Sequence, residues 1–235
     1  LIQSILDGAV IVGTDFVGGA AGKVNNFRND SGAAVVVRTV VEGSSTVRSE
    51  SGSAVGGVAG DVYVQGASNS GSIELSGHTS IPTLSVVGTD AVGGVVGSYR
   101  SSNGNYSSLK TPDQSVTNTL IIHVDGNNYV GGAIGLLRNS TYYKNSLSDV
   151  LDSSLCAVDI KIAVNVVLHP QSSITGSGDD VGGAIGLIIS GNKDNGKAKF
   201  KGTHKANSRR SKLRRIITKR YCKKIWRFKT VCFSS

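Results

Sequence analysis

The segment Val130-Gly131-Gly132-Ala133-Ile134-Gly135 is one of five copies of a Val-Gly-Gly-x-x-Gly element in this chain of 235 residues. The element begins at residues 17, 55, 92, 130 and 181, so the intervals are 38, 37, 38 and 51 residues. A regular interval of this length is typical of a stack in which each repeat buries its apolar face against its neighbours. The element therefore predicts a repeat architecture over most of the chain.

The glycines of the element are expected to be structural. Stacked coils bring equivalent residues to strand spacing, about 4.8 Å, so a side chain at a crowded bend would meet its own copies. This prediction covers the same glycines in every copy: Gly18, Gly19, Gly22, Gly56, Gly57, Gly60, Gly93, Gly94, Gly97, Gly131, Gly132, Gly135, Gly182, Gly183 and Gly186.

A polar turn precedes each element and predicts a corner of the coil. Glycine in these turns supplies a positive φ, and Asp or Asn caps its own backbone. We expect equivalent corners at Asp15, Asp90, Asn128 and Asp180. A column of such oxygens could hold Ca²⁺, but the calcium-binding nonapeptide pattern places its Asp after the glycines. We therefore favour turn capping, and we predict no metal and no cofactor.

The segments between corners alternate with period two, which is typical of strands with one buried and one wet face. Leu120, Ile122 and Val124 alternate with Ile121 and His123. In the same way, Val62 and Val64 are expected to face the core while Asp61, Tyr63 and Gln65 face water. Helical spacing is absent from the first 190 residues. The predicted fold class is therefore all-β.

The repeated element resembles the GLUG motif, a glycine-rich repeat of large bacterial surface proteins. Those proteins include adhesins of the filamentous haemagglutinin kind and some IgA-cleaving peptidases. The match is best in Val130 to Gly135 and Val181 to Gly186, both Val-Gly-Gly-Ala-Ile-Gly, although the family's Leu is Ala or Val here. The resemblance implies a right-handed parallel β-helix or related β-solenoid, at the cell surface or secreted, and it implies no catalytic residue.

Charge divides the chain into two parts. Residues 1–192 hold 9 basic and 15 acidic residues, whereas residues 193–235 hold 16 basic residues and one acidic residue, Asp194. We predict a β-solenoid domain over 1–192 and a basic tail over 193–235. An apolar stripe from Leu213 to Cys232 indicates a basic amphipathic helix, which could bind an anionic lipid surface or nucleic acid. A disordered tail and a translation artefact stay open as alternatives.

Motifs of catalysis are missing from the sequence. No Gly-x-Gly-x-x-Gly opens a helix and no Gly-Lys-Ser/Thr follows any copy of the element. The acidic residues of the body are scattered, and His78, His123 and His169 lie in unequal repeat contexts, so we treat each histidine as a surface residue. We therefore predict that the chain is not an enzyme.

The number of cysteines and the hydropathy of the chain exclude further classes of protein. Only Cys156 precedes the tail, which excludes a disulfide framework and a multi-cysteine zinc site in the body. No run of about 18 apolar residues predicts a transmembrane helix. The chain opens in mid-pattern with Leu1 and shows no signal peptide, which we interpret as an internal piece of a longer protein.

Tyrosines and polar loops suggest a binding surface. Tyrosine offers apolar area with a polar tip, and five tyrosines concentrate in the third and fourth repeats: Tyr99, Tyr106, Tyr129, Tyr142 and Tyr143. The favoured function is a non-enzymatic structural or adhesive segment, an extended stalk or a loop-presenting surface. Its expected ligand is a host cell, a neighbouring cell or a polysaccharide, with no nucleic acid on the body. The alternative is a non-catalytic accessory module of a large secreted hydrolase or peptidase.

Overall fold

The computed structural model describes residues 1–25, 35–65, 71–78, 80–102, 109–110, 113–117, 119–139, 160–161, 164–178 and 180–189. In these ranges the chain is all-β, and every strand pairing is parallel. Four five-stranded sheets, named A to D here, are present in the described part, together with a two-stranded sheet.

The strands of each sheet come from successive repeats. Sheet A contains β1 (Ile2–Leu6), β5 (Val35–Val41), β9 (Gly71–Gly77), β14 (Asp113–Val116) and β19 (Val164–Val166). Sheet B contains β2 (Val10–Gly13), β6 (Ser45–Ser49), β10 (Thr83–Val87), β15 (Ile121–Gly126) and β20 (Ser173–Gly176). Sheet C contains β3 (Phe16–Gly18), β7 (Ala54–Gly56), β11 (Ala91–Gly93), β16 (Val130–Gly131) and β21 (Val181–Gly182). Sheet D contains β4 (Ala21–Val24), β8 (Ala59–Gln65), β12 (Val96–Ser102), β17 (Ile134–Asn139) and β22 (Ile185–Ile189). The two-stranded sheet pairs β13 (Leu109–Lys110) with β18 (Ile160–Lys161).

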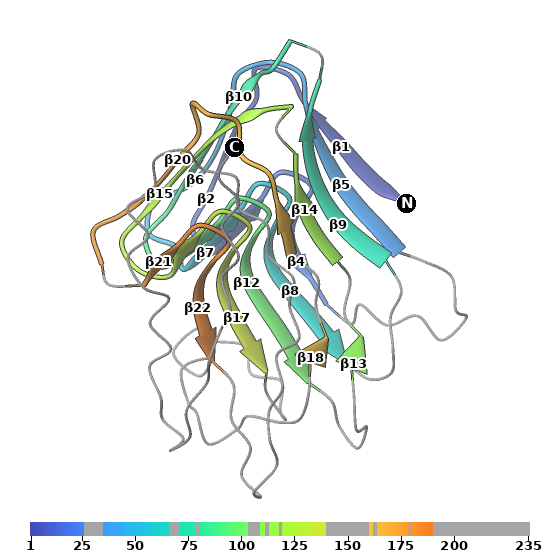
Figure 1. Ribbon diagram of the computed structural model, residues 1–235, viewed down its shortest axis with the longest axis vertical. Helices are drawn as coiled ribbons and strands as arrows, with labels where there is room; N and C mark the ends of the chain where they lie inside the picture. Colours follow the sequence, from blue (N-terminus) through green and yellow to red (C-terminus); the bar gives the residue numbers. More distant parts are fainter. Residues whose placement is uncertain are drawn as a thin grey trace, which may run out of the picture.

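Each repeat makes one coil of a parallel β-solenoid, which confirms the predicted fold class. Coil 1 runs from β1 to β4, coil 2 from β5 to β8, coil 3 from β9 to β12, coil 4 from β14 to β17 and coil 5 from β19 to β22. Each strand pairs with the strand at the same position in the next coil. Figure 1 shows this stacking most clearly in sheet D, where β4, β8, β12, β17 and β22 lie side by side.

The Val-Gly-Gly-x-x-Gly element joins sheet C to sheet D and stacks in strict register. Val17, Val55, Val92, Val130 and Val181 pair with one another along sheet C, and the glycine after each valine pairs in the same way. The bend itself is also hydrogen bonded between coils, because the Val58 amide donates to the Val95 carbonyl at 2.9 Å and the Val95 amide to the Ala133 carbonyl at 2.9 Å. The backbone ladder therefore continues around the bend.

The third glycine of the element lets sheet D pack with its backbone directly on sheet C. A Cβ added at Gly97 would lie 2.7 Å from the Ala91 carbonyl oxygen of the same coil, and closer still to the backbone of Val55 in the coil before. Real Cβ atoms essentially never come within 3.0 Å of such atoms. A side chain at this position would separate the two sheets, so the fold-back requires glycine.

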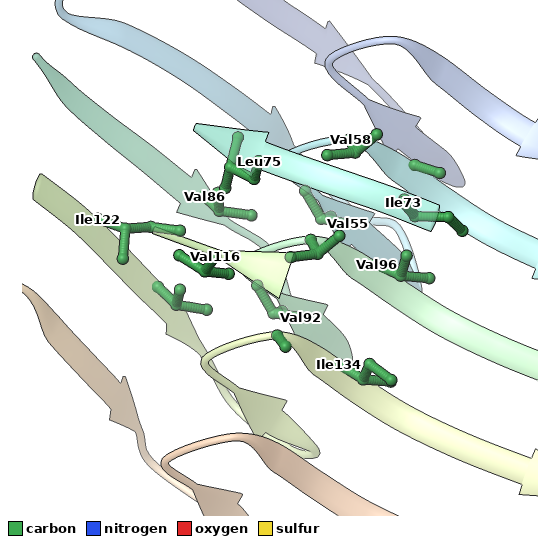
Figure 2. Packing of buried hydrophobic residues seen from close by; sticks show 14 of the residues in the cluster. Val55, Val58, Ile73, Leu75, Val86, Val92, Val96, Val116, Ile122 and Ile134 are labelled. Carbon is green, nitrogen blue, oxygen red and sulfur yellow. The ribbon is translucent and has the colours of Figure 1, made fainter. Parts of the chain in front are cut away.

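The inward-facing residues form one continuous core along the stack. In sheet B, Ile122 and Val124 are buried while Ile121 and His123 are half-buried, as the period-two pattern predicts. Figure 2 shows how side chains from successive coils, such as Val55 and Val92, are directed into the same interior. Because every coil contributes valine, isoleucine or leucine at these rows, each coil buries its apolar side chains against those of its neighbours.

The glycines that precede the element do not serve the role expected from the sequence. Among the described glycines only Gly8 has a positive φ, of 62°, so the expectation of positive φ at the corners was wrong. A Cβ at Gly88 would instead lie 2.6 Å from Cγ2 of Val55, and one at Gly126 would lie 2.7 Å from Cγ2 of Val92. These corner glycines leave room for the core valine of the element.

Candidate functional site

The outward face of sheet D carries the strongest concentration of buried charge in the described part of the chain. Two adjacent rows run across the coils on this face. One contains Lys23, Asp61, Ser98, Leu136 and Leu187, and the other contains Tyr63, Arg100 and Arg138. The exposed fractions are 0% for Asp61, 4% for Tyr63, 5% for Arg100 and 1% for Arg138.

This burial corrects the expectation that Asp61 and Tyr63 face water. The alternation of residues correctly separates them from Val62 and Val64, which point to the opposite face. Alternation gives the direction of a side chain, but it does not establish that the second face is solvated. Sheet D is buried on both faces over its middle strands, and this could not be read from the pattern alone.

Asp61 and Arg100 form a buried two-point ion pair between coil 2 and coil 3. The Arg100 Nε donates to Asp61 Oδ1 at 2.9 Å, and Nη2 of the same guanidinium donates to Oδ2. The Arg100 guanidinium also lies 5.7 Å from the centre of the Tyr63 ring. A guanidinium that contacts both oxygens of a carboxylate fixes the relative orientation of the two side chains. The pair therefore acts as a structural clamp between coils.

The corner row before the element contains Asp15, Asp90 and Asn128 at equivalent positions. Each lies two residues before the paired valine of its coil. The Asn128 side-chain amide donates to Asp90 Oδ1 at 3.2 Å, which links coil 4 to coil 3. These side chains are exposed or half-buried, so this is a ladder of corner side chains at the surface.

Asp180 does not belong to that row, which corrects the expectation of four equivalent corners. It lies one residue before Val181 and so matches Tyr129 in coil 4. The shift arises because five positions separate the paired residues Gly176 and Val181, whereas four separate their partners Gly126 and Val130. Asp180 is also 9% exposed, unlike the surface corners.

Tyr129 lies beside the corner row and close to two carboxylates. Burial raises the pKa of its hydroxyl, and the nearby carboxylates of Asp180 and Asp90 raise it further. The Tyr129 hydroxyl therefore stays protonated at neutral pH. Its backbone has a φ of 52°, a left-handed conformation that is uncommon for a residue with a side chain.

The outward face of sheet A carries a second ion pair between coils 2 and 3, and this one is partly exposed to solvent. The Arg38 guanidinium donates to Glu74 Oε2 from Nη2 at 2.6 Å and from Nε at 2.8 Å. A hydrogen bond from Ser72 lowers the pKa of the Glu74 carboxyl, and Arg38 lowers it further, against an opposing effect of burial. This pair therefore links two neighbouring strands at the surface of the stack.

Two of the predicted surface histidines form hydrogen bonds with polar groups of sheet B or of the turn before it. His123 Nδ1 is hydrogen bonded to Ser173 Oγ at 2.8 Å, and His169 Nδ1 accepts from the Gln171 amide at 3.3 Å. Over the described ranges, no group of three or more His, Cys, Asp or Glu residues is placed to hold a metal ion.

The structure describes two of the five tyrosines that were predicted to form a binding surface. Tyr99 is 0% exposed and belongs to the core, so its expected place on a binding surface was wrong. Tyr129 is half-buried next to the corner row. The remaining tyrosines of the prediction, Tyr106, Tyr142 and Tyr143, lie outside the described residues, as do Cys156 and the basic tail over 193–235.

Comparisons with protein-family models, with curated proteins and with solved structures find no match to this chain. In the part of the chain that the structure describes, no helix is long and apolar enough to cross a membrane.

Proposed function

We propose that the chain is a non-enzymatic, rod-like segment of a bacterial cell-surface or secreted protein, of the kind that carries GLUG repeats. Its role would be that of a stalk that also presents binding surfaces to a host cell, a neighbouring cell or a polysaccharide. The observation that carries the proposal is the register of the stack. The same valine and glycine positions pair through five coils of the described chain.

Register of this kind supports a mechanical role for physical reasons. Each coil adds about 4.8 Å to the length of the stack, and each is joined to the next by strand ladders in sheets A to D. A force along the stack must break several parallel hydrogen-bonded ladders before one coil separates from the next. Buried clamps such as Asp61 with Arg100 add to the connection between coils.

Single-molecule pulling of the full chain tests the stalk role. We expect successive force peaks, because coils should detach in turn, and each peak should release about 130 Å of chain for a repeat of 38 residues. A variant with Gly132→Val should lose these peaks, since the substitution disrupts the stack. If the unaltered chain extends smoothly without peaks, it is not a load-bearing stalk.

Binding is tested separately on the same protein. The purified full chain is applied to cultured host cells, to bacterial cells and to an array of polysaccharides. Saturable binding that is lost with Gly132→Val would support presentation of a folded surface. Absence of binding to every target, with force peaks retained, would contradict the adhesive role and leave the stalk role standing.

A further inference from the structure

One row of exposed side chains on the outward face of sheet B has opposite charges on the two sides of a central valine. The row takes one residue from each coil, in the order Val12, Arg48, Val87, Asp125 and Thr175. Val12 is 45% exposed and Val87 is 36% exposed, and the other three side chains are exposed as well. Val87, in coil 3, therefore lies between a cation in coil 2 and an anion in coil 4.

The two charges of this row are too far apart to pair within one copy of the chain. Arg48 and Asp125 lie two coils apart, about 9.6 Å, whereas Arg38 and Glu74 on sheet A lie in adjacent coils and form an ion pair. Arg48 contacts Glu50 at 3.5 Å, but the two side chains are 48% and 64% exposed. An ion pair that is so exposed contributes little to stability, so Arg48 can exchange it for another carboxylate at small cost.

The neighbouring row of the same face consists mostly of small side chains. It contains Val10, Thr46, Ser85, His123 and Ser173. Small side chains leave the face of a sheet flat, and two flat sheets pack face to face at a separation of about 10 Å. The face of sheet B is therefore shaped to receive another sheet.

We infer that two copies of this chain form a side-by-side dimer through the outward faces of sheet B, with a two-fold axis parallel to β10 at the level of coil 3. This axis keeps the direction of the strands and reverses the order of the coils, so Val87 meets Val87 of the second copy. Arg48 then faces Asp125 of the second copy, and Asp125 faces its Arg48. The contact is isologous and closes at two copies.

Charge distinguishes this dimer from the other aligned two-fold arrangement of the same face. An axis parallel to the stack would place each coil against the same coil of the second copy. Arg48 would then lie near Arg48 of the second copy, and Asp125 near its Asp125. Like charges that face each other across a contact oppose association, so the axis parallel to β10 is favoured.

The connection between β9 and β10 lies at one end of this contact. Gly77 and Leu84 are seven positions apart. Their partners in coil 2, Val41 and Ser45, are four positions apart, so this corner is three residues longer in coil 3, and it rises above the neighbouring corners in Figure 1. It carries Ile81, which is 44% exposed. Because the axis passes at the level of coil 3, the two copies of this connection lie at the same end of the dimer, one on each side of the axis.

The size of the contact predicts a weak, reversible dimer. A face of four residues by five coils measures about 13 Å by 24 Å, or about 310 Å², which is less than half of the area of about 800 Å² that each partner buries in a standard interface. The charges and the axis belong to coils 2 to 4 and to the side of the rod. The inference therefore does not depend on how the stack ends, and it does not depend on the adhesive role.

Sedimentation equilibrium of the full chain over a range of concentrations tests the inference. We expect a monomer–dimer equilibrium that shifts toward monomer as salt screens the charge pairs. Val87→Asp places two carboxylates at the axis and should abolish the dimer, with an unchanged circular dichroism spectrum. Val40→Asp is the matched control, because Val40 lies on the outward face of sheet A, and it should leave the dimer intact. A chain that stays monomeric up to its solubility limit would overturn the inference and leave the face to another occupant.

A charge exchange tests the direction of the axis. Arg48→Asp and Asp125→Arg should each weaken dimerisation about tenfold or more, because each reversal places like charges at both pairs of the dimer. A mixture of the two single variants should recover association as a heterodimer, and the double variant should recover it as a homodimer. Glu74→Arg, a reversal on sheet A, should have no effect. If neither the mixture nor the double variant recovers association, the coils do not meet in this order and the inference fails.

Discussion

The middle and terminal coils of the solenoid use the same residues in the same register and yet differ in burial. Val92 and Val130 are fully buried in coils 3 and 4, whereas Val181, their partner in coil 5, is only half-buried. Likewise, Gly132 has a carbonyl oxygen against it and Gly183 has open space. The difference teaches that a coil obtains its stability from its neighbours more than from its own sequence, as in other repeat proteins.

Alanine substitution of the second glycine should show the largest difference between the coils. Gly132→Ala is expected to lower the free energy of unfolding by about 4 kcal/mol or more, because its Cβ would overlap a carbonyl oxygen of coil 5. Gly183→Ala should be neutral or stabilise the dilute protein by about 0.5 kcal/mol, since alanine restricts the unfolded chain. Urea unfolding of both variants measures the difference, and equal losses would contradict the comparison.

Two ion pairs join coils 2 and 3, one buried and one partly exposed. Because they connect the same two coils, comparing them shows how burial changes the contribution of an ion pair to stability. Asp61→Ala leaves the Arg100 guanidinium buried without its carboxylate partner and should cost about 3 to 5 kcal/mol. Glu74→Ala removes the partner of a solvent-exposed guanidinium and should cost less than about 1 kcal/mol. Chemical denaturation of both variants checks this. A similar cost for the two would mean that burial of the pair is not decisive.

Truncation of the paired valine tests the core of a middle coil against that of an end coil. Val92→Ala should lower the free energy of unfolding by about 2 to 3 kcal/mol, because it leaves a cavity between filled coils. Val181→Ala should lower it by about 1 kcal/mol, since this side chain already contacts water. Thermal unfolding in dilute solution provides the measurement. A larger loss at Val181 would show that the end coil is covered.

The smallest expected effect is the pH dependence contributed by Glu74. Its pKa is lowered in the folded chain, so its contribution to stability is complete above the unfolded pKa, about 4.3, and is lost as the pH falls through the folded pKa. The unaltered chain should exceed Glu74→Gln in stability by less than about 1 kcal/mol at neutral pH. The two stability curves should converge in acid, and parallel curves from neutral pH to acid would contradict this assignment.

Several features of the fold could be predicted from the sequence because they repeat. The interval between copies of the element predicted stacked coils, and the alternation around Ile122 and Val124 predicted which residues enter the core. The prediction was less successful where repeats differ in length. Asp180 lies one residue before its valine, whereas Asp15, Asp90 and Asn128 lie two residues before theirs. Counting back from the glycine of the turn hides this difference, and counting back from the valine reveals it.

The buried charges of sheet D could not be predicted for a different reason. Asp61 and Arg100 are 39 residues apart and lie in different copies of the repeat. Their contact is diagonal, because Arg100 pairs along the sheet with Tyr63, two residues after Asp61. A search for charged residues at the same position of successive repeats does not find such a pair. A search of the next repeat at an offset of two residues would find it.

The sequence by itself determined the coil: the repeated valine sets the core row and the repeated glycines mark the bends, because both recur at the same position of every repeat. Only the tertiary structure decided which faces are buried and which atoms each glycine makes room for. Tyr99 in the core, the Asp61 and Arg100 clamp, and the open space at Gly183 all depend on which chain segments lie alongside. Burial is a property of neighbours, and in a stack the neighbours of a residue are about 38 positions away.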